Sequence, residues 1–296
     1  MQKIFISLSL LTFILTACSK NDDLSDGYGN FDAHAEVIVS AQATGEILSF
    51  DINEGDHLNR GKILGQIDTI DLHLKKIVLV RQKESIASQL KDIRATIAVQ
   101  QQQLEINLTN QRRIQNLYKN QAATQKQLDD INGLVDLNKK QISATRAKRD
   151  GILSKMQSVD AQIAQVNEAI DKCSIKNPIN GTVLVKYAEK GELATPGKPL
   201  YKIANLQTLE LKAYIIGSDL NRLKIGKTVK VYYDKNKKEN FSIPGTVTWI
   251  SSQAEFTPKT IQTKEERVNL VYAVKILVDN DGSIKIGMPG EFKIVD

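Results

Sequence analysis

Proline is absent before Pro178, and the sequence contains only two cysteines, Cys18 and Cys173. Long helices can form in a chain segment without proline, because proline removes a backbone donor and breaks the helical turn. Cys18 lies at the end of an apolar N-terminal segment, which leaves Cys173 without a partner for an internal disulfide. We therefore expect Cys173 to be a small, partly buried residue.

Sequence signatures of catalysis are also missing. The three histidines, His34, His57 and His73, do not show the HExxH spacing of a zinc site. There is no GxxxxGK(S/T) phosphate-binding loop and no GxSxG nucleophile elbow. We therefore expect no enzymatic activity, no metal and no cofactor. The formal net charge of +6 is spread beside acidic and amide residues without an aromatic and basic cluster, so we expect no nucleic-acid partner.

The N-terminus has the pattern of a bacterial lipoprotein signal. Lys3 precedes an apolar segment, residues 4–16, that is too short to span a bilayer as a mature helix. The segment ends in LTAC at Cys18, which resembles a lipobox. This pattern predicts a signal peptide at residues 1–17, lipidation of Cys18 and a flexible, lipid-anchored tether at residues 18–34. The alternatives are an uncleaved anchor helix or a plain secretory signal, and all of them imply export.

Two segments of the chain repeat one another with a constant offset of 136 residues. They read TGEILSFDINEGDHLNRGKILGQID (residues 44–68) and NGTVLVKYAEKGELATPGKPLYKIA (residues 180–204). The matches include three glycine pairs: Gly45 with Gly181, Gly55 with Gly191, and Gly61 with Gly197. Glycine takes positive φ values at little cost, so matched glycines indicate the same turns in two halves of one small β-domain, residues 35–70 and 174–204.

Between these halves, residues 71–173 have the composition of long helices, with apolar residues at steps of three, four or their sums. The apolar positions are Ile86, Leu90, Ile93, Ile97, Leu104 and Leu108 in a first arm, and Leu128, Ile131, Val135, Ile142, Ile152, Met156, Val159, Ile163, Val166 and Ile170 in a second. The pattern breaks at residues 119–124, and Thr124 to Gln127 has the form of a capping box. Two such arms predict an antiparallel coiled-coil hairpin whose tip lies at about residues 119–124.

After Asn205 the pattern is that of short strands. The candidate strands are Thr208–Ile216, Thr228–Tyr233, Pro244–Ile250, Val268–Val278 and Glu291–Val295. A short helix is expected at Asp219–Leu223, and glycine-containing turn signals separate several of the strands. Five or six strands with one short helix predict a small β-barrel at residues 205–296, with Trp249 in its core.

These parts, in this order, resemble a periplasmic adaptor, or membrane fusion protein, of the HlyD type. The resemblance covers residues 35–296. It implies an α+β fold in which a lipoyl-like (barrel-sandwich hybrid) β-domain is split by an antiparallel coiled-coil hairpin and followed by a small β-barrel. The hairpin replaces the turn that carries the modified lysine of a true lipoyl domain, so no carrier chemistry is expected. The segment Ala254–Asn280 and the GMPGEF sequence at Gly287–Phe292 look like the branch of the family that works beside ABC transporters.

The resemblance extends to the hairpin tip. Family members that dock on a TolC-type outer-membrane channel carry Arg-x3-Leu-x6-Ser there, and Arg113, Leu117 and Thr124 have this spacing with threonine in place of serine. The resemblance implies that Arg113 donates hydrogen bonds to the channel, that Leu117 buries its side chain against it, and that Thr124 contacts it while capping its own helix. The alternative is a solvated Arg113, with Leu117 as the last seam residue and Thr124 as a cap only.

Three functions are compatible with the sequence. The resemblance implies a non-enzymatic periplasmic adaptor, a ring of six copies, that links an inner-membrane ABC permease and ATPase to a TolC-type channel for efflux or secretion. Its lipid on Cys18 would hold it to a membrane of a Gram-negative bacterium, with the inner membrane favoured. The second possibility is an adaptor of a proton-driven RND-type pump, although such adaptors use N-terminal strands to build a fourth domain. The third is a structural or surface-exposed lipoprotein without a pump, which the SKNDD sequence at residues 19–23 keeps open.

Overall fold

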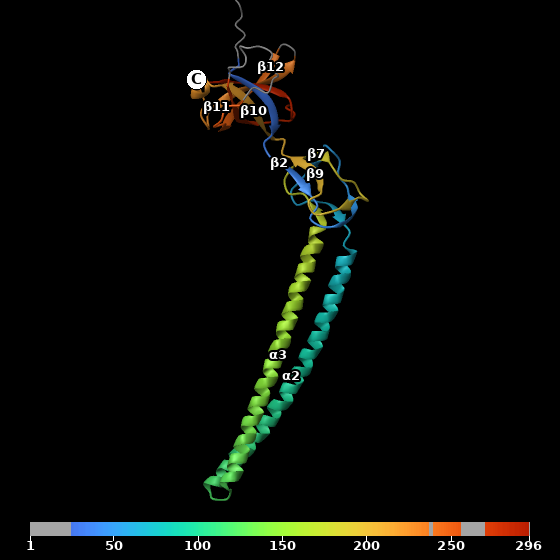
Figure 1. Cartoon of the computed structure of the whole chain (residues 1–296), viewed down its shortest axis with the longest axis vertical. Coiled ribbons are helices and arrows are strands. Elements are labelled where there is room, and N and C mark those ends of the chain that lie inside the picture. The colour runs from blue at the N-terminus through green and yellow to red at the C-terminus, as the bar shows by residue number, and fades with distance from the viewer. Residues whose placement is uncertain (1–24, 237–238, 256–269, 296) are drawn as a thin grey trace, which may run out of the picture.

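The computed structural model describes residues 25–236, 239–255 and 270–295, and it shows three parts in a row along an elongated molecule (Figure 1). A β-barrel occupies one end, a small domain of two sheets lies in the middle, and a long helical hairpin extends to the other end. The predicted fold class is therefore confirmed. The predicted signal peptide at 1–17 and the lipidated Cys18 lie outside the described residues, as does most of the segment Ala254–Asn280.

The hairpin consists of α2 (Ile70–Lys119) and α3 (Gln125–Lys172). The 50 residues of α2 span ~75 Å at the usual helical rise. Both helices run without a break because neither contains proline. The chain turns at residues 120–124, where Gln121 has a φ of 61°, and the predicted capping box at Thr124 is present. The tip thus lies where the sequence predicts it, at the far end from the barrel (Figure 1).

The helices pack along an apolar seam. Its most buried members are Leu90, Ile97, Val135, Ile142, Val159 and Val166, all at predicted positions. Two polar contacts across the seam define the register: Lys83 Nζ lies 2.6 Å from Asp160 Oδ1, and Gln111 Nε2 donates to Asn132 Oδ1 at 2.7 Å. The polar residues Asn107, Asn138 and Thr145 are also buried in the hairpin, which the apolar pattern did not predict.

The middle domain is built from both halves of the repeat. One sheet has the strand order β2 (Glu36–Ser40), β9 (Pro199–Ala204), β7 (Gly181–Lys186) and β4 (His57–Leu58). The other has the order β6 (Ser174–Lys176), β5 (Ile63–Ile67), β3 (Gly45–Phe50) and β8 (Leu193–Ala194). Each sheet therefore contains strands from before and after the hairpin, and together they enclose one core that includes Ile47, Ile67, Tyr201 and Ile203. The two halves of the repeat form a single domain.

The six repeated glycines serve two different purposes. Gly55, Gly61, Gly191 and Gly197 have φ values of 90°, 82°, 89° and 90°, so the matched turns share one left-handed geometry. Gly45 and Gly181 instead begin strands where the chain packs closely. A Cβ atom on Gly181 would lie 2.4 Å from the carbonyl oxygen of Ala204, and one on Gly45 would lie 2.8 Å from Ile67 Cγ2. The positive-φ explanation was thus wrong for Gly181, where space requires glycine, whereas Gly45 combines a φ of 157° with a close neighbour.

The barrel closes in the order β1 (Gly27–Ala33), β10 (Thr208–Ile216), β13 (Val271–Asp279), β12 (Glu239–Ile250), β11 (Thr228–Asn236) and β14 (Pro289–Ile294). A short 3-10 helix, η1 (Leu220–Arg222), lies within the predicted helical segment. Trp249 is not in the core as predicted: it is 41% exposed, and Lys275 Nζ lies 6.0 Å from the centre of its ring. Phe31 and Phe292 are among the fully buried residues that fill the barrel.

Strand β1 corrects the predicted domain boundaries. Residues 27–33 were expected to belong to a flexible tether (18–34), yet they pair with β10 on one side and with β14 on the other. The close packing explains the glycines: a Cβ atom on Gly29 would lie 1.9 Å from the carbonyl oxygen of Lys212. The barrel is therefore formed by strands β10 to β14 together with β1, a strand that precedes the middle domain.

Candidate functional site at the hairpin tip

The turn at the tip is held by local hydrogen bonds. The backbone N–H of Ala122 donates to the carbonyl of Leu117 at 2.8 Å, and that of Gln121 donates to the carbonyl of Tyr118 at 3.0 Å. The backbone N–H of Thr124 donates to Gln127 Oε1 at 2.8 Å, and the N–H of Gln127 donates to Thr124 Oγ1 at 3.3 Å. The tip is therefore a shaped turn rather than a loose loop.

The three residues predicted to dock a partner all lie at this end. Leu117 is 40% exposed, so it is not enclosed in the seam, and its neighbour Tyr118 is 38% exposed. The side chain of Arg113 is exposed one turn before Leu117 on α2. Thr124 is exposed at the N-cap of α3 and makes its cap hydrogen bond. The structure thus places Arg113, Leu117 and Thr124 at one end of the rod and open to solvent.

A groove between the helices lies directly behind the turn. Its volume is about 410 Å³ and it is lined by Asn110, Arg113, Ile114, Gln127, Asp130, Ile131 and Leu134. Ile114 and Ile131 are partly buried and supply apolar surface, while Arg113 and Asp130 are exposed. Leu134 on α3 is 42% exposed. A groove of this kind suits one apolar side chain of a partner, flanked by one acceptor for Arg113 and one donor for Asp130.

The sequence reasoning missed Asp130 and Leu134. The motif spacing ends at Thr124 and does not reach the second turn of α3. The signal that could have found them is the antiparallel pairing itself, because residues equally far from the turn lie level with one another. Asp130 is nearly as far after the turn as Arg113 is before it.

Besides the groove at the tip, a stripe of exposed apolar residues lies on the face of α2 that points away from α3. Its members are 40–71% exposed and fall on one helix face, with polar residues such as Arg81 and Asp92 between Ile77 and Val99: Ile70, Leu74, Ile77, Val99, Ile106 and Leu117. Helix α3 presents Leu134 and Leu137, 42% and 53% exposed, near the height of Ile106. Near the height of Ile106, the exposed side chains of Val99, Leu134 and Leu137 offer apolar surface that another molecule can cover.

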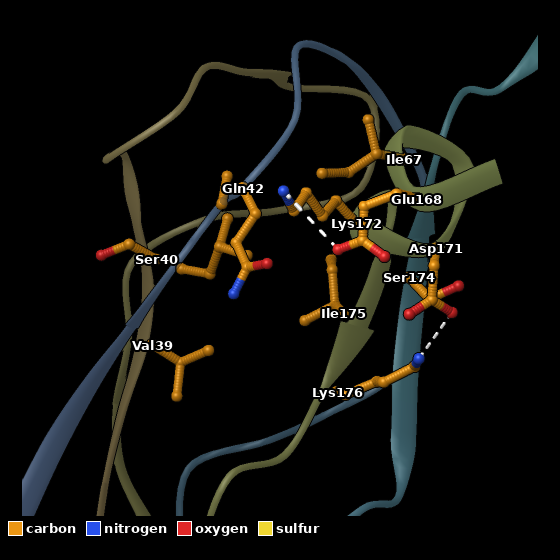
Figure 2. Close-up of a pocket in the computed structure, with 12 residues that line it drawn as sticks. Val39, Ser40, Gln42, Ile67, Glu168, Asp171, Lys172, Ser174, Ile175 and Lys176 are labelled. Atoms are coloured by element: carbon orange, nitrogen blue, oxygen red, sulfur yellow. Dashed lines mark hydrogen bonds and ion pairs between the residues drawn. The ribbon is translucent and has the colours of Figure 1, made fainter. Parts of the chain in front are cut away.

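At the other end of the hairpin, α3 is fastened to the middle domain. A small pocket of about 120 Å³ lies at this junction, and Lys172 and Lys176 line it (Figure 2). Lys172 Nζ lies 3.6 Å from Glu168 Oε1, and Lys176 Nζ lies 2.7 Å from Asp171 Oδ1. Both lysines are therefore paired, and the second pair joins α3 to β6. Cys173 lies fully buried between these two lysines in the sequence, and burial, with the negative charge of Asp68, raises the pKa of its thiol. The Lys176–Asp171 pair therefore attaches the base of α3 to the middle domain.

The described residues contain no group of three His, Cys, Asp or Glu side chains that could hold a metal ion. Neither long helix, nor any other helix in the described part of the chain, has an apolar stretch sufficient to cross a membrane.

Comparisons with known proteins agree with this architecture. A family model described as "RND MFP, barrel-sandwich hybrid domain" matches residues 35–205. The UPF0194 membrane protein YbhG of Salmonella paratyphi B is 25% identical over an aligned length of 321 residues. The alignment covers 94% of this chain and 91% of that protein. The YbhG protein of Salmonella newport gives the same values.

Solved structures share the fold at low sequence identity. MacA from Actinobacillus actinomycetemcomitans has a TM-score of 0.59 at 17% identity, with 91% of this chain and 78% of MacA covered. The membrane fusion protein Spr0693 from Streptococcus pneumoniae R6 has a TM-score of 0.56 at 14% identity, with 90% of this chain and 97% of Spr0693 covered. The matching family model spans more than half of the chain and coincides with the split β-domain and its inserted hairpin. The chain therefore belongs to the membrane fusion protein family of periplasmic adaptors.

Proposed function

We propose that this protein is the periplasmic adaptor of a tripartite export system and links an inner-membrane transporter to a TolC-type outer-membrane channel. The observation that carries the proposal is the tip: a ~75 Å hairpin presents Arg113, Leu117 and Thr124 at the end farthest from the barrel (Figure 1). A rod with a shaped, exposed end and a firmly attached base transmits position and force. The protein then acts by coupling two partners and not by catalysis.

The proposed lipid anchor fits the opposite end of the molecule. Residue 18 precedes the start of β1 at Gly27 by nine positions, a span of at most about 30 Å for an extended chain. A lipid on Cys18 would therefore keep the barrel close to a membrane while the hairpin points away from it (Figure 1). We favour the inner membrane, because the tip would then reach toward the outer-membrane channel.

For the inner-membrane partner we favour an ABC permease with its ATPase. In RND-type adaptors N-terminal strands build a fourth domain, whereas here the strand before the middle domain, β1, is used to close the barrel. The likeness of Ala254–Asn280 to the ABC-associated branch supports the same choice. The RND-type pump is the second candidate, because the matching family model carries an RND description.

Self-association into a ring, for which we propose six copies, is supported by the apolar stripe on the outer face of α2. Val99 and Ile106 are 71% and 48% exposed there, and a neighbouring hairpin of parallel orientation would bring Leu137 of its α3 to the same height. The stripe does not favour our third candidate, a surface lipoprotein without a pump, because a rod that acts alone would leave this apolar surface uncovered.

The test is cross-linking from the tip in intact cells. A photoreactive amino acid at Leu117 should capture an outer-membrane channel, and the same residue at Lys190, an exposed position on the middle domain, should not. Capture of an ABC permease or of an RND pump from positions on the barrel separates the first two candidates. A tip that captures no outer-membrane protein, in cells that export normally, rejects the docking proposal.

A further inference from the structure

Two asparagines lie in the apolar seam of the hairpin, one on each helix. Asn107 of α2 is 4% exposed and Asn138 of α3 is 8% exposed. Among the residues that the structure describes, the side-chain amide nitrogens of both are buried without a hydrogen-bond partner, as is Oε1 of Gln100 on α2. A buried polar group without a partner costs about 1–3 kcal/mol, so two of them in one coiled coil require an explanation.

The two asparagines lie at nearly the same height along the rod. Because the two helices are antiparallel, the numbers of two residues at the same height add to a constant. The Lys83–Asp160 ion pair and the Gln111–Asn132 hydrogen bond both give a sum of 243. With this register Asn107 lies level with residue 136, two residues or about 3 Å along the axis from Asn138. Both side chains point into the same seam, since both are buried there.

We propose that Asn107 and Asn138 form a polar layer across the seam that fixes the register of the two helices. The oxygen of Asn107 already accepts a hydrogen bond from Gln103 Nε2 at 3.3 Å. Its nitrogen still needs an acceptor, and we assign that role to the amide oxygen of Asn138, whose orientation can be exchanged with its nitrogen by a turn about the last side-chain bond. The two asparagines are thus positioning residues, because this register brings Arg113 and Asp130 into one groove at the tip.

The cost of a wrong register explains why the asparagines are useful. The other buried residues of the seam are Leu, Ile and Val, apart from Thr145, and apolar residues of similar size can replace one another at a packing position at little cost. A shift of one heptad in one direction would place Asn138 opposite Ile114, and a shift in the other would place Asn107 opposite Ile131. Each shift leaves an amide buried against an isoleucine. A single polar layer therefore selects one register at some cost in stability.

The experiment measures register by disulfide formation in the full chain with both native cysteines replaced by serine. The native register is reported by Lys83→Cys with Asp160→Cys, at positions whose side chains are in contact. Shifts of one heptad are reported by Lys83→Cys with Leu153→Cys and by Lys83→Cys with Asn167→Cys. With both asparagines present, we expect the native pair alone to form a disulfide, as identified by mass spectrometry.

Substitution of the asparagines should separate stability from register. Asn107→Leu alone and Asn138→Leu alone should each lower the Tm, because the remaining amide then faces a leucine. The double variant should raise the Tm above that of the parent chain, and at least one shifted pair should reach about a tenth of the native yield. The control Asn116→Leu, at an exposed position of α2, should change neither quantity.

Two results would overturn the inference. A double variant that forms the native disulfide alone shows that the asparagines do not select the register. Single variants that raise the Tm as the double variant does show that the two amides are not paired. Export is not measured in this experiment, so its outcome is independent of whether a channel docks at the tip.

Discussion

Arg113 of α2 and Asp130 of α3 line one groove behind the hairpin turn, and in the described part of the chain no ion pair within 4 Å joins them. Both side chains are exposed, and in solvent an arginine and a carboxylate gain little by pairing. A partner that excludes water from the groove would strengthen the interactions of both groups. The tip therefore offers one donor and one acceptor on either side of apolar surface.

Reversal of the charge at Arg113 should remove the proposed contact with the channel. We expect Arg113→Glu to lower export at least tenfold while the protein remains folded and abundant, because the side chain is exposed and unpaired among the described residues. The matched control is Arg112→Glu, which changes an exposed neighbour that does not line the groove. Equal export from both variants and the parent chain would contradict docking through Arg113.

Asp130 should contribute to the same contact from the other helix. We expect Asp130→Lys to lower cross-linking from Leu117 to the channel several-fold, with no change in the Tm. Asp136→Lys is the control, since Asp136 is exposed on the same helix but does not line the groove. If Asp130→Lys behaves as the control does, docking involves α2 and the turn but not α3.

Thr124 has a structural role that can be measured apart from docking. Thr124→Ala removes the side-chain cap of α3 and should lower the free energy of unfolding by about 1 kcal/mol, whereas Thr124→Ser keeps the hydroxyl and should have little effect. Chemical denaturation measures both. A Thr124→Ala variant that is as stable as the parent chain would show that the capping box contributes nothing at this turn.

Gly133 and Gly151 lower the stability of α3, and no neighbouring atom requires glycine at either position. A Cβ atom on either glycine would meet no atom within 4 Å in the described structure. Each Gly→Ala substitution should therefore raise the free energy of unfolding of the hairpin by up to about 1 kcal/mol, as measured by denaturation. Substitutions that destabilise the chain instead would indicate that another molecule approaches α3 closely at these positions.

The hairpin and the split domain could be predicted because their signals are local and repeated. The absence of proline, the spacing of residues such as Leu90 and Val159, and the capping box at Thr124 fix two helices and a turn. The glycines at 55, 61, 191 and 197 mark turns of the same geometry in both halves. Each of these signals depends on neighbours in the sequence, so no knowledge of long-range contacts was needed.

The missed features depend on contacts between distant segments. Strand β1 has the sequence GYGNFDA, which looks like a linker because Gly27 and Gly29 are required by the close approach of β10 and only Phe31 supplies a large buried side chain. Asn107 was passed over in favour of its neighbour Leu108, since the apolar pattern assigns seam positions to apolar residues alone. Asp130 becomes a candidate site residue only because it lines one groove with Arg113 of the other helix.

The pairing of β1 with β14 has a consequence for how the protein matures. The barrel joins residues 27–30 to residues 289–292, so its last gap closes only after residue 292 has been delivered to the compartment in which the protein folds. Contacts that span such a sequence distance form slowly. Proteolysis near either end during secretion would therefore leave an open sheet with two unpaired edges, a species prone to aggregate, and quality-control proteases should recognise it first.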